Sequence, residues 1–371
     1  MNKIQLILVD TNLEYANYIS RYVRTSEIHD KVNLRTFTSK ETLNQFLKKD
    51  PVIHIGLVSE DVYAKWGSDS FVHQADLLFL LEEDTRNPVG ERGVYKYQPT
   101  HHLFSYILSV YFEEFQTSLS AGHQKAKLLS FHSALGGTGK TSLSVNLSRQ
   151  LTLLGYKVFY FNLELVNGTS LFFQSPEDEH TIQLYYYAKE KPELLGSKLD
   201  HLIKRDPYNG VDYFDVAVNP LEVKELTGDH VQTILDSLVH SDRYDFIVMD
   251  LDSQLQSHTK KAIEVSDLLL WVLNIDVKDF HKTNHSLTFS SQLYGEKVNL
   301  EEKTFFILNG YSRELPVEFE RFNVPVHVKL PEMKGWKNLT SGRPVTTTSI
   351  FPQHILQLIV EQDVEDGVRL G

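Results

Sequence analysis

The chain has 371 residues, of which 41% are hydrophobic and 23% are charged, and its formal net charge is −12. This length favours two domains, or one large one, and the composition is that of a soluble globular protein. The sequence has no cysteine, which excludes disulfides, zinc–thiolate sites, iron–sulfur clusters and thiol nucleophiles. The acidic balance argues against a broad surface that neutralises phosphates, so strong binding to nucleic acid is not expected.

The first 117 residues alternate between strand signals and helix signals. Apolar runs typical of strands occupy residues 4–9, 32–37, 52–58, 76–81 and 93–97. Helical spacing of apolar residues occupies 13–23, 40–49 and 101–115. Strands separated by helices predict a parallel sheet, and five such units fit a small α/β domain of the flavodoxin-like type. Small and polar residues at 118–127 predict a linker, so the second domain would cover 128–371.

A glycine-rich loop follows the first strand-like run of the second domain, at 128–133. It reads ALGGTGKTS at 134–142 and opens a helical pattern that ends at Gly155. A strand, a loop ending in Gly-Lys-Thr and a helix in this order predict a phosphate-binding loop of the P-loop NTPase fold, with a mostly parallel sheet. The predicted nucleotide-binding residues are Gly136, Gly137, Thr138, Gly139, Lys140, Thr141 and Ser142.

Three side chains carry the specific chemistry of this prediction. Lys140 would contact the terminal phosphates, and the hydroxyl of Thr141 would bind Mg²⁺. A second acid at the end of another strand holds such a metal through water, and Asp250 follows the apolar run at 244–249. Asp252 lies two residues further on, and the sequence leaves its role open.

These motifs resemble the MinD/ParA group of deviant Walker A ATPases. The run GGTGKTSLSVNLSRQLTLLGYKVFYFNLE at 136–164 is similar to the loop, helix and second strand that open that family's domain. FFILNGYS at 305–312 resembles the strand end whose asparagine reads adenine. VPVHVKLPEMKGW at 324–336 resembles the stretch that closes over the base. The resemblance implies ATP as the nucleotide, with Asn309 and Pro331 as further nucleotide-binding residues.

Two other segments extend the resemblance over the whole second domain. SDLLLWVLNID at 266–276 is similar to the strand after the family's switch II segment, and SGRPVTT at 341–347 to the turn before its last helix.

Departures from the family's pattern bear on hydrolysis. In the family, a lysine at the position of Leu135 crosses a two-fold dimer to the partner's phosphates. The family's D-x-D segment reads Asn162-Leu163-Glu164 here, which leaves Glu164 to orient water. The resemblance therefore implies a homodimer that binds ATP and Mg²⁺, with Lys140 and Glu164 as catalytic residues and with slow or absent hydrolysis.

The first domain resembles a response-regulator receiver. Leu57 falls where a receiver carries its phosphoacceptor aspartate, while Asp10 and Lys96 match its strand-end acid and its lysine of the fifth strand. Without the aspartate the domain cannot accept phosphate, which favours a recognition or dimerisation module. A flavodoxin-like domain of unrelated origin is the alternative.

A degenerate receiver fused to a MinD/ParA-like ATPase resembles the TadZ/CpaE family, which positions the Tad (Flp) pilus secretion machinery at the cell pole. This implies an ATP-binding scaffold whose partners are pilus or secretion proteins. We expect a cytoplasmic protein that such partners recruit to the membrane periphery or the pole, without a membrane anchor of its own. Asp10 and Glu14 interrupt the N-terminal apolar run too early for a signal peptide, and the chain ends in the acidic EQDVEDGVRLG.

Four other functions remain alternatives. A DNA-partition ParA would need a basic surface, and a division-type MinD would need a basic amphipathic membrane helix. A metabolic P-loop ligase would need a catalytic set, which the tyrosine-rich segment at 180–195 does not offer. A two-component regulator with an ATPase output is disfavoured by the missing phosphoacceptor.

Overall fold

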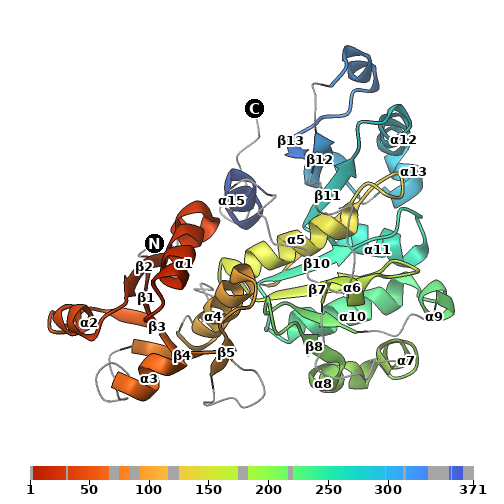
Figure 1. Ribbon diagram of the computed structural model, residues 1–371. Coiled ribbons are helices and arrows are strands. Elements are labelled where there is room, and N and C mark those ends of the chain that lie inside the picture. Colours follow the sequence, from red (N-terminus) through yellow and green to blue (C-terminus); the bar gives the residue numbers. More distant parts are fainter. Residues whose placement is uncertain are drawn as a thin grey trace. The chain divides into compact units, whose positions relative to one another are not determined.

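The computed structural model describes residues 3–30, 32–66, 75–83, 92–115, 125–173, 183–215, 220–296, 298–311, 315–332, 351 and 353–361. The chain divides into two compact units, Met1–Thr117 and Ser118–Gly371 (Figure 1). Most of the expected linker at 118–127 lies outside the described residues, as do SGRPVTT at 341–347 and nearly all of the acidic end of the chain.

The first unit contains a five-stranded sheet in the order β2-β1-β3-β4-β5, and all of its strand pairs are parallel. The strands are β1 (Ile4–Val9), β2 (Val32–Phe37), β3 (Ile53–Ser59), β4 (Ala75–Glu82) and β5 (Gly93–Tyr95). The helices are α1 (Leu13–Thr25), η1 (Glu27–Asp30), α2 (Lys40–Leu47), α3 (Glu60–Trp66) and α4 (Thr100–Phe115). This strand order is that of flavodoxin-like folds, so the predicted fold class of the unit is confirmed.

Helices cover both faces of this sheet because its central strands β1, β3 and β4 are largely apolar on both sides. In β1, Leu6 and Leu8 belong to one core with α1 and α4, whereas Ile7 and Val9 belong to a second core with α2 and α3. Asn12 begins α1 by accepting the backbone N–H of Tyr15 at 3.0 Å.

The second unit contains an eight-stranded sheet in the order β13-β12-β11-β6-β10-β7-β9-β8. Its strands are β6 (Lys127–His132), β7 (Val158–Asn162), β8 (Ile203–Arg205), β9 (Asp212–Phe214), β10 (Phe246–Asp250), β11 (Leu268–Leu273), β12 (Thr304–Tyr311) and β13 (Val328–Pro331). Among these described strands only β8 and β9 pair antiparallel. The predicted mostly parallel sheet is therefore confirmed.

Helices also cover both faces of the second sheet. They are α5 (Lys140–Leu153), α6 (Thr169–Phe172), α7 (Gln183–Glu190), α8 (Pro192–Leu202), α9 (Pro220–Lys224), α10 (Gly228–His240), α11 (Ser257–Val265), α12 (Val277–Thr288), α13 (Ser290–Tyr294), α14 (Leu300–Lys303), η3 (Val317–Phe322) and α15 (Gln353–Glu361). The predicted apolar face of α5, with Leu143, Leu147 and Leu151, packs on the sheet together with α15. The larger core on the opposite face includes α7, α8, α10 and α11.

The order of the strands determines where a site can form. β6 lies between β10 and β11, and Asp250 at the end of β10 is in register with Phe131 of β6 and with Asn162 of β7. The carboxyl ends of these parallel strands thus meet at one edge, where open α/β sheets bind ligands. No helix of the described part of the chain is long and apolar enough to span a membrane.

Candidate nucleotide-binding site

Residues 133–139 join β6 to α5 as a tight loop. Gly137 and Gly139 have φ angles of 76° and 94°, which side chains other than glycine rarely adopt. A Cβ on Gly139 would also collide with Nδ2 of Asn309. Ala134 packs against the large core, so alanine is accommodated where the phosphate-loop pattern has its first glycine.

The start of α5 leaves backbone donors for a ligand. Its N-cap residue, Gly139, supplies no side-chain hydrogen bond to the first turn. The first N–H groups of a helix have no partner within the helix, and they lie at the positive end of its dipole. The first turn contains Lys140, Thr141 and Ser142, so the predicted phosphate donors are available there.

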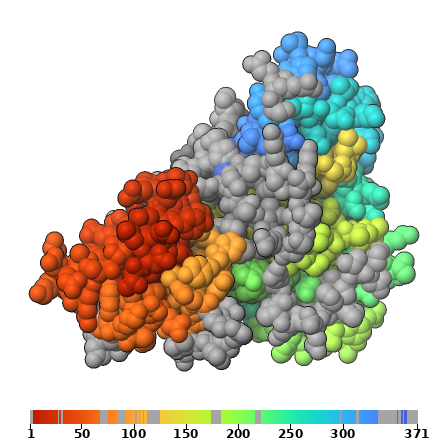
Figure 2. All heavy atoms as spheres, in the orientation of Figure 1, coloured from red at the N-terminus to blue at the C-terminus, as the bar shows by residue number. Residues whose placement is uncertain are grey.

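Gly136 and Gly137 are exposed, whereas Thr138 is buried. Atoms of the yellow segment, which contains the loop, reach the surface beside the cyan segment that contains α12 (Figure 2). The loop is therefore open to solvent on the face shown.

Lys140 lies beneath the loop, with 5% of its surface exposed. Its Nζ donates a hydrogen bond to Oγ of Ser253 at 3.0 Å. Ser253 in turn donates to the carbonyl oxygen of Leu135 at 2.9 Å, and Ser133 donates to the same oxygen at 2.5 Å. The loop is thus tied to the segment that follows β10.

Two carboxylates stand at the neighbouring strand ends. The Thr141 hydroxyl donates to Oε2 of Glu164 at 3.3 Å. Asp250 is completely buried; its Oδ2 accepts the Tyr160 hydroxyl at 3.0 Å, while its Oδ1 has no hydrogen-bond partner within the described chain. Burial and the negative charge of Glu164 raise the pKa of Asp250 to about 7. Burial also raises the pKa of Glu164.

This arrangement fits a divalent cation. A buried carboxylate oxygen without a donor and a second nearby carboxylate are oxygen ligands of the kind that Mg²⁺ prefers, directly or through water. A cation would relieve the burial cost and the repulsion that raise both pKa values. The Thr141 hydroxyl, beside Glu164, is the other metal-binding oxygen that the sequence predicts.

Asn162 takes part in the same network. Its Nδ2 donates to the Tyr160 hydroxyl at 3.3 Å, and its Oδ1 accepts the backbone N–H of Glu164 at 2.8 Å. A chain of donors therefore runs from Asn162 through Tyr160 to Asp250. Tyr160 was not predicted, because in the sequence it resembles any other aromatic residue of a buried strand.

The two residues predicted to contact the base lie in β12 and β13, the last two strands on one side of the sheet. Nδ2 of Asn309 donates to the carbonyl of Thr138 at 2.8 Å, which places it against the phosphate loop. Pro331 is exposed and pairs with Tyr311 at the end of β12. Their contact with adenine stays a prediction. Asp252 is half-buried, and its Oδ1 accepts the N–H of Gln254 at 3.1 Å.

Two buried titratable residues near the loop were not predicted. His132 ends β6, and burial together with the charge of Lys140 lowers its pKa to about 3, so it is neutral. Asp279 in α12 accepts the N–H of Asn274 at 2.9 Å, and burial raises its pKa to about 6. A single histidine or aspartate in an element gives no sequence signal of this kind.

In the first unit, the structure brings Asp10 and Lys96 together. Nζ of Lys96 lies 2.9 Å from Oδ2 of Asp10 and 3.0 Å from Oε1 of Glu83. Leu57 is completely buried in β3, two residues before the strand ends at Ser59. Its neighbours in β3 are Gly56 and Val58, so neither adjacent residue is an acid.

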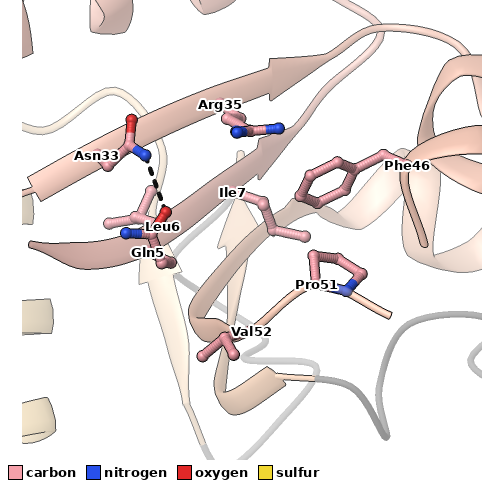
Figure 3. Close-up of a pocket in the computed structure, with 8 residues that line it drawn as sticks. All are labelled: Gln5, Leu6, Ile7, Asn33, Arg35, Phe46, Pro51 and Val52. Carbon is pink, nitrogen blue, oxygen red and sulfur yellow. Dashed lines mark hydrogen bonds between the residues drawn. The ribbon is translucent and has the colours of Figure 1, made fainter. Parts of the chain in front are cut away.

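Two cavities lined by described residues lie away from the phosphate loop. One of about 200 Å³ is in the first unit, where Nδ2 of Asn33 donates to Oε1 of Gln5 at 2.8 Å and Arg35 lies 4.9 Å from the Phe46 ring (Figure 3). The other, of about 820 Å³, lies between α12, η3, β12 and β13. Neither includes a residue of the candidate site.

Comparisons with known proteins agree with this geometry. A family model described as an AAA domain matches residues 126–288, which include the loop, Glu164 and Asp250. A ParA family ATPase from Chlorobium tepidum TLS is similar in structure, with a TM-score of 0.51 and 16% identity over 63% of this chain and 98% of that chain. The second unit has the fold of MinD/ParA-type P-loop ATPases.

Two solved MinD structures are also similar. The cell division ATPase MinD of Pyrococcus furiosus is 23% identical, with a TM-score of 0.46 over 58% of this chain and 87% of that chain. The septum site-determining protein MinD of Pyrococcus horikoshii OT3, complexed with Mg-ADP, is 24% identical, with a TM-score of 0.46 over 58% of this chain and 84% of that chain. No curated protein matches the chain.

Proposed function

We propose that the second unit binds ATP with Mg²⁺ and that the chain acts as a positioning scaffold of the TadZ/CpaE type. ATP binding would favour a homodimer, and the dimer would localise a Tad (Flp) pilus or a related secretion machinery. Hydrolysis would be weak or absent.

The observation that carries this proposal is the combination of an uncapped helix start, a buried lysine and a buried carboxylate of which one oxygen has no hydrogen-bond partner among the described residues. The first turn of α5 follows a glycine loop and receives no side-chain cap from Gly139, so its N–H groups can donate to a ligand. Lys140 is buried beneath that loop, and Oδ1 of Asp250 has no hydrogen-bond partner within the described residues. Together these groups supply anion donors, a cation and a metal acceptor, which is the chemistry that a magnesium nucleotide requires.

Each residue would have a distinct role at this site. The N–H groups of the loop and of α5 would hold phosphate oxygens, and Lys140 would neutralise the terminal phosphates. Mg²⁺, when bound, would neutralise further phosphate charge. Thr141 would bind it directly, and Asp250 would hold it through water. Asn309, already bound to the loop at Thr138, would orient the base beside it.

Slow hydrolysis follows from what Leu135 and Asn162 lack. A cationic residue supplied in trans contributes roughly three to five orders of magnitude to phosphoryl transfer in GTPases. Leu135 has no charge, and its carbonyl is bound by two serine hydroxyls. The carboxamide of Asn162 is occupied by Tyr160 and by the Glu164 backbone, so Glu164 alone would orient water.

The first unit would recognise a partner or a second copy rather than a phosphate donor. Leu57 is buried where a receiver would have its acceptor, and Lys96 is neutralised by Asp10 and Glu83. A lysine held by two carboxylates needs no phosphoryl group to satisfy it.

Calorimetry with Mg-ATP tests nucleotide binding, and a pull-down tests the cellular role. We expect the purified chain to bind Mg-ATP and to retain a pilus secretion ATPase from cells that contain the machinery. Binding without such a partner would leave the nucleotide assignment intact and refute the pilus role.

A partition-type or other spatial regulator is the second candidate, because the ParA family ATPase of Chlorobium tepidum shares the fold. Salt-sensitive retention on DNA would favour that function over the scaffold.

A further inference from the structure

Ser253 occupies the point where the phosphate loop meets the segment after β10. It lies three residues after Asp250 and precedes α11. Its hydroxyl is within hydrogen-bond distance of Nζ of Lys140, of the carbonyl oxygen of Leu135 and, at 3.3 Å, of the hydroxyl of Ser133. One side chain therefore contacts both ends of the loop.

The protons in this network can be assigned consistently. A serine hydroxyl has one proton to donate and two lone pairs to accept with. Ser253 gives its proton to the Leu135 carbonyl and accepts one from the Lys140 ammonium. Ser133 gives its own proton to the same carbonyl. Each of the two hydroxyls therefore donates a single hydrogen bond.

This contact is the one hydrogen bond of the Lys140 ammonium within the described part of the chain. The side chain is nearly inaccessible to water, so solvent contributes little to satisfying its charge. The carboxylates of Glu164, Asp250 and Asp279 lie close enough to influence it, but none forms a salt bridge with it among the described residues. Ser253 is thus the group that fixes the direction of the ammonium.

We propose that Ser253 is a positioning residue that holds Lys140 beneath the loop and competes with the nucleotide phosphates for its ammonium. The inference rests on the proposed nucleotide binding. When a phosphate draws the ammonium away, Ser253 loses its donor, and the link from Lys140 to residues 251–256 is broken. The hydroxyl therefore sets the nucleotide affinity and connects occupancy of the loop to the segment that follows Asp250.

If Ser253 and the phosphates compete for Lys140, loss of the Ser253 hydroxyl should strengthen nucleotide binding. Removing the hydroxyl leaves the buried ammonium less satisfied in the empty protein, while the ammonium in the bound state has phosphate oxygens instead. A hydrogen bond to a charged group shifts an equilibrium by roughly ten- to a hundredfold when it is lost outright, and partial rearrangement reduces this. We expect Ser253→Ala to tighten Mg-ATP binding by roughly three- to tenfold.

Two variants serve as matched controls in the same calorimetric titration. Ser253→Thr keeps a hydroxyl at this position and should return the dissociation constant to within about twofold of wild type. Ser133→Ala removes the other hydroxyl that donates to the Leu135 carbonyl. Within the described chain the Ser133 hydroxyl has no hydrogen bond to Lys140, so this variant should shift the affinity less than Ser253→Ala. Unchanged or weaker binding by Ser253→Ala would overturn the competition.

A double-mutant cycle in the nucleotide-free protein separates this inference from the proposed function. The shifts in urea midpoint caused by Lys140→Met and by Ser253→Ala should not add up to the shift of the double variant. The first substitution removes the donor of the hydrogen bond and the second removes its acceptor. Additive midpoints in a protein that binds Mg-ATP would overturn the role of Ser253. Coupled midpoints in a protein that binds no nucleotide would instead refute the proposed function and the competition, leaving only the contact.

Discussion

Replacing Asp250 by asparagine should stabilise the empty protein at pH 8. The carboxyl is completely buried, and burial followed by repulsion from Glu164 raises its pKa from 3.8 to about 7. The folded state therefore binds this proton more tightly than the unfolded state does. The resulting stability is fully present below pH 4 and is lost as the pH rises through 7.

The structure bounds the size of the effect. Each pKa unit corresponds to about 1.4 kcal/mol, so the ionised carboxylate costs the empty protein at most about 4 kcal/mol at pH 8. Asparagine has no charge, and its carbonyl oxygen can still accept the Tyr160 hydroxyl. Its amide group must find acceptors of its own, which offsets part of the gain. We expect a net gain of about 1–3 kcal/mol at pH 8 that shrinks towards pH 6.

Urea unfolding at pH 6 and pH 8, without magnesium or nucleotide, measures this gain. With Mg-ATP present, the wild type should become more stable than Asp250→Asn. The wild type is stabilised by the bound nucleotide, whereas the variant lacks a carboxylate that would hold the metal. Asp252→Asn is the matched control, because it changes a half-buried acid on the same segment that accepts a local N–H from Gln254. A variant at position 250 that is less stable than wild type at pH 8 would refute the reasoning.

Three further predictions test the remaining assignments. Lys140→Ala should abolish Mg-ATP binding in calorimetry, since it removes the one cation buried beneath the described loop; unchanged affinity would contradict the site. Wild-type ATP turnover should stay near background while ATP raises the melting temperature, and Leu135→Lys should raise the rate only slightly because Asn162 is unchanged; robust wild-type turnover would show that another residue replaces the missing lysine. Acetyl phosphate should add no phosphoryl group by intact mass, because Leu57 is buried without a neighbouring acid; a stoichiometric adduct would refute this.

The sequence predicted the buried strands well, because their signal is local. The apolar run at 4–9 coincides with the buried β1 to the residue, and the segment at 266–276 contains the buried β11. A strand covered on both faces is apolar throughout and stands out from its flanks. The antiparallel pair β8 and β9 was not predicted, since strands of three residues are too short to show a period.

The contacts within the candidate site were less accessible to prediction. The loop pattern located Lys140 and Thr141, and the strand end located Asp250, because each motif follows from neighbouring residues. Ser253 and Leu135 form a hydrogen bond although they are 118 residues apart in the sequence, and the residues around neither position predict that contact. The contact depends on β10 and β6 being adjacent in the sheet, which is a property of the strand order.

In the proposed function, Asn162 would favour the binding of ATP over its turnover. Its Nδ2 donates to Tyr160, which donates to Asp250, so the carboxamide supports the buried acid instead of repelling it. An aspartate at 162 could not donate to Tyr160, and it would add a third carboxylate beside two whose pKa values are already raised. The neutral side chain thus stabilises the strand ends without a metal, while it removes an acid that would help to position water. Together with the uncharged Leu135, this is why we expect ATP to be bound with little or no hydrolysis.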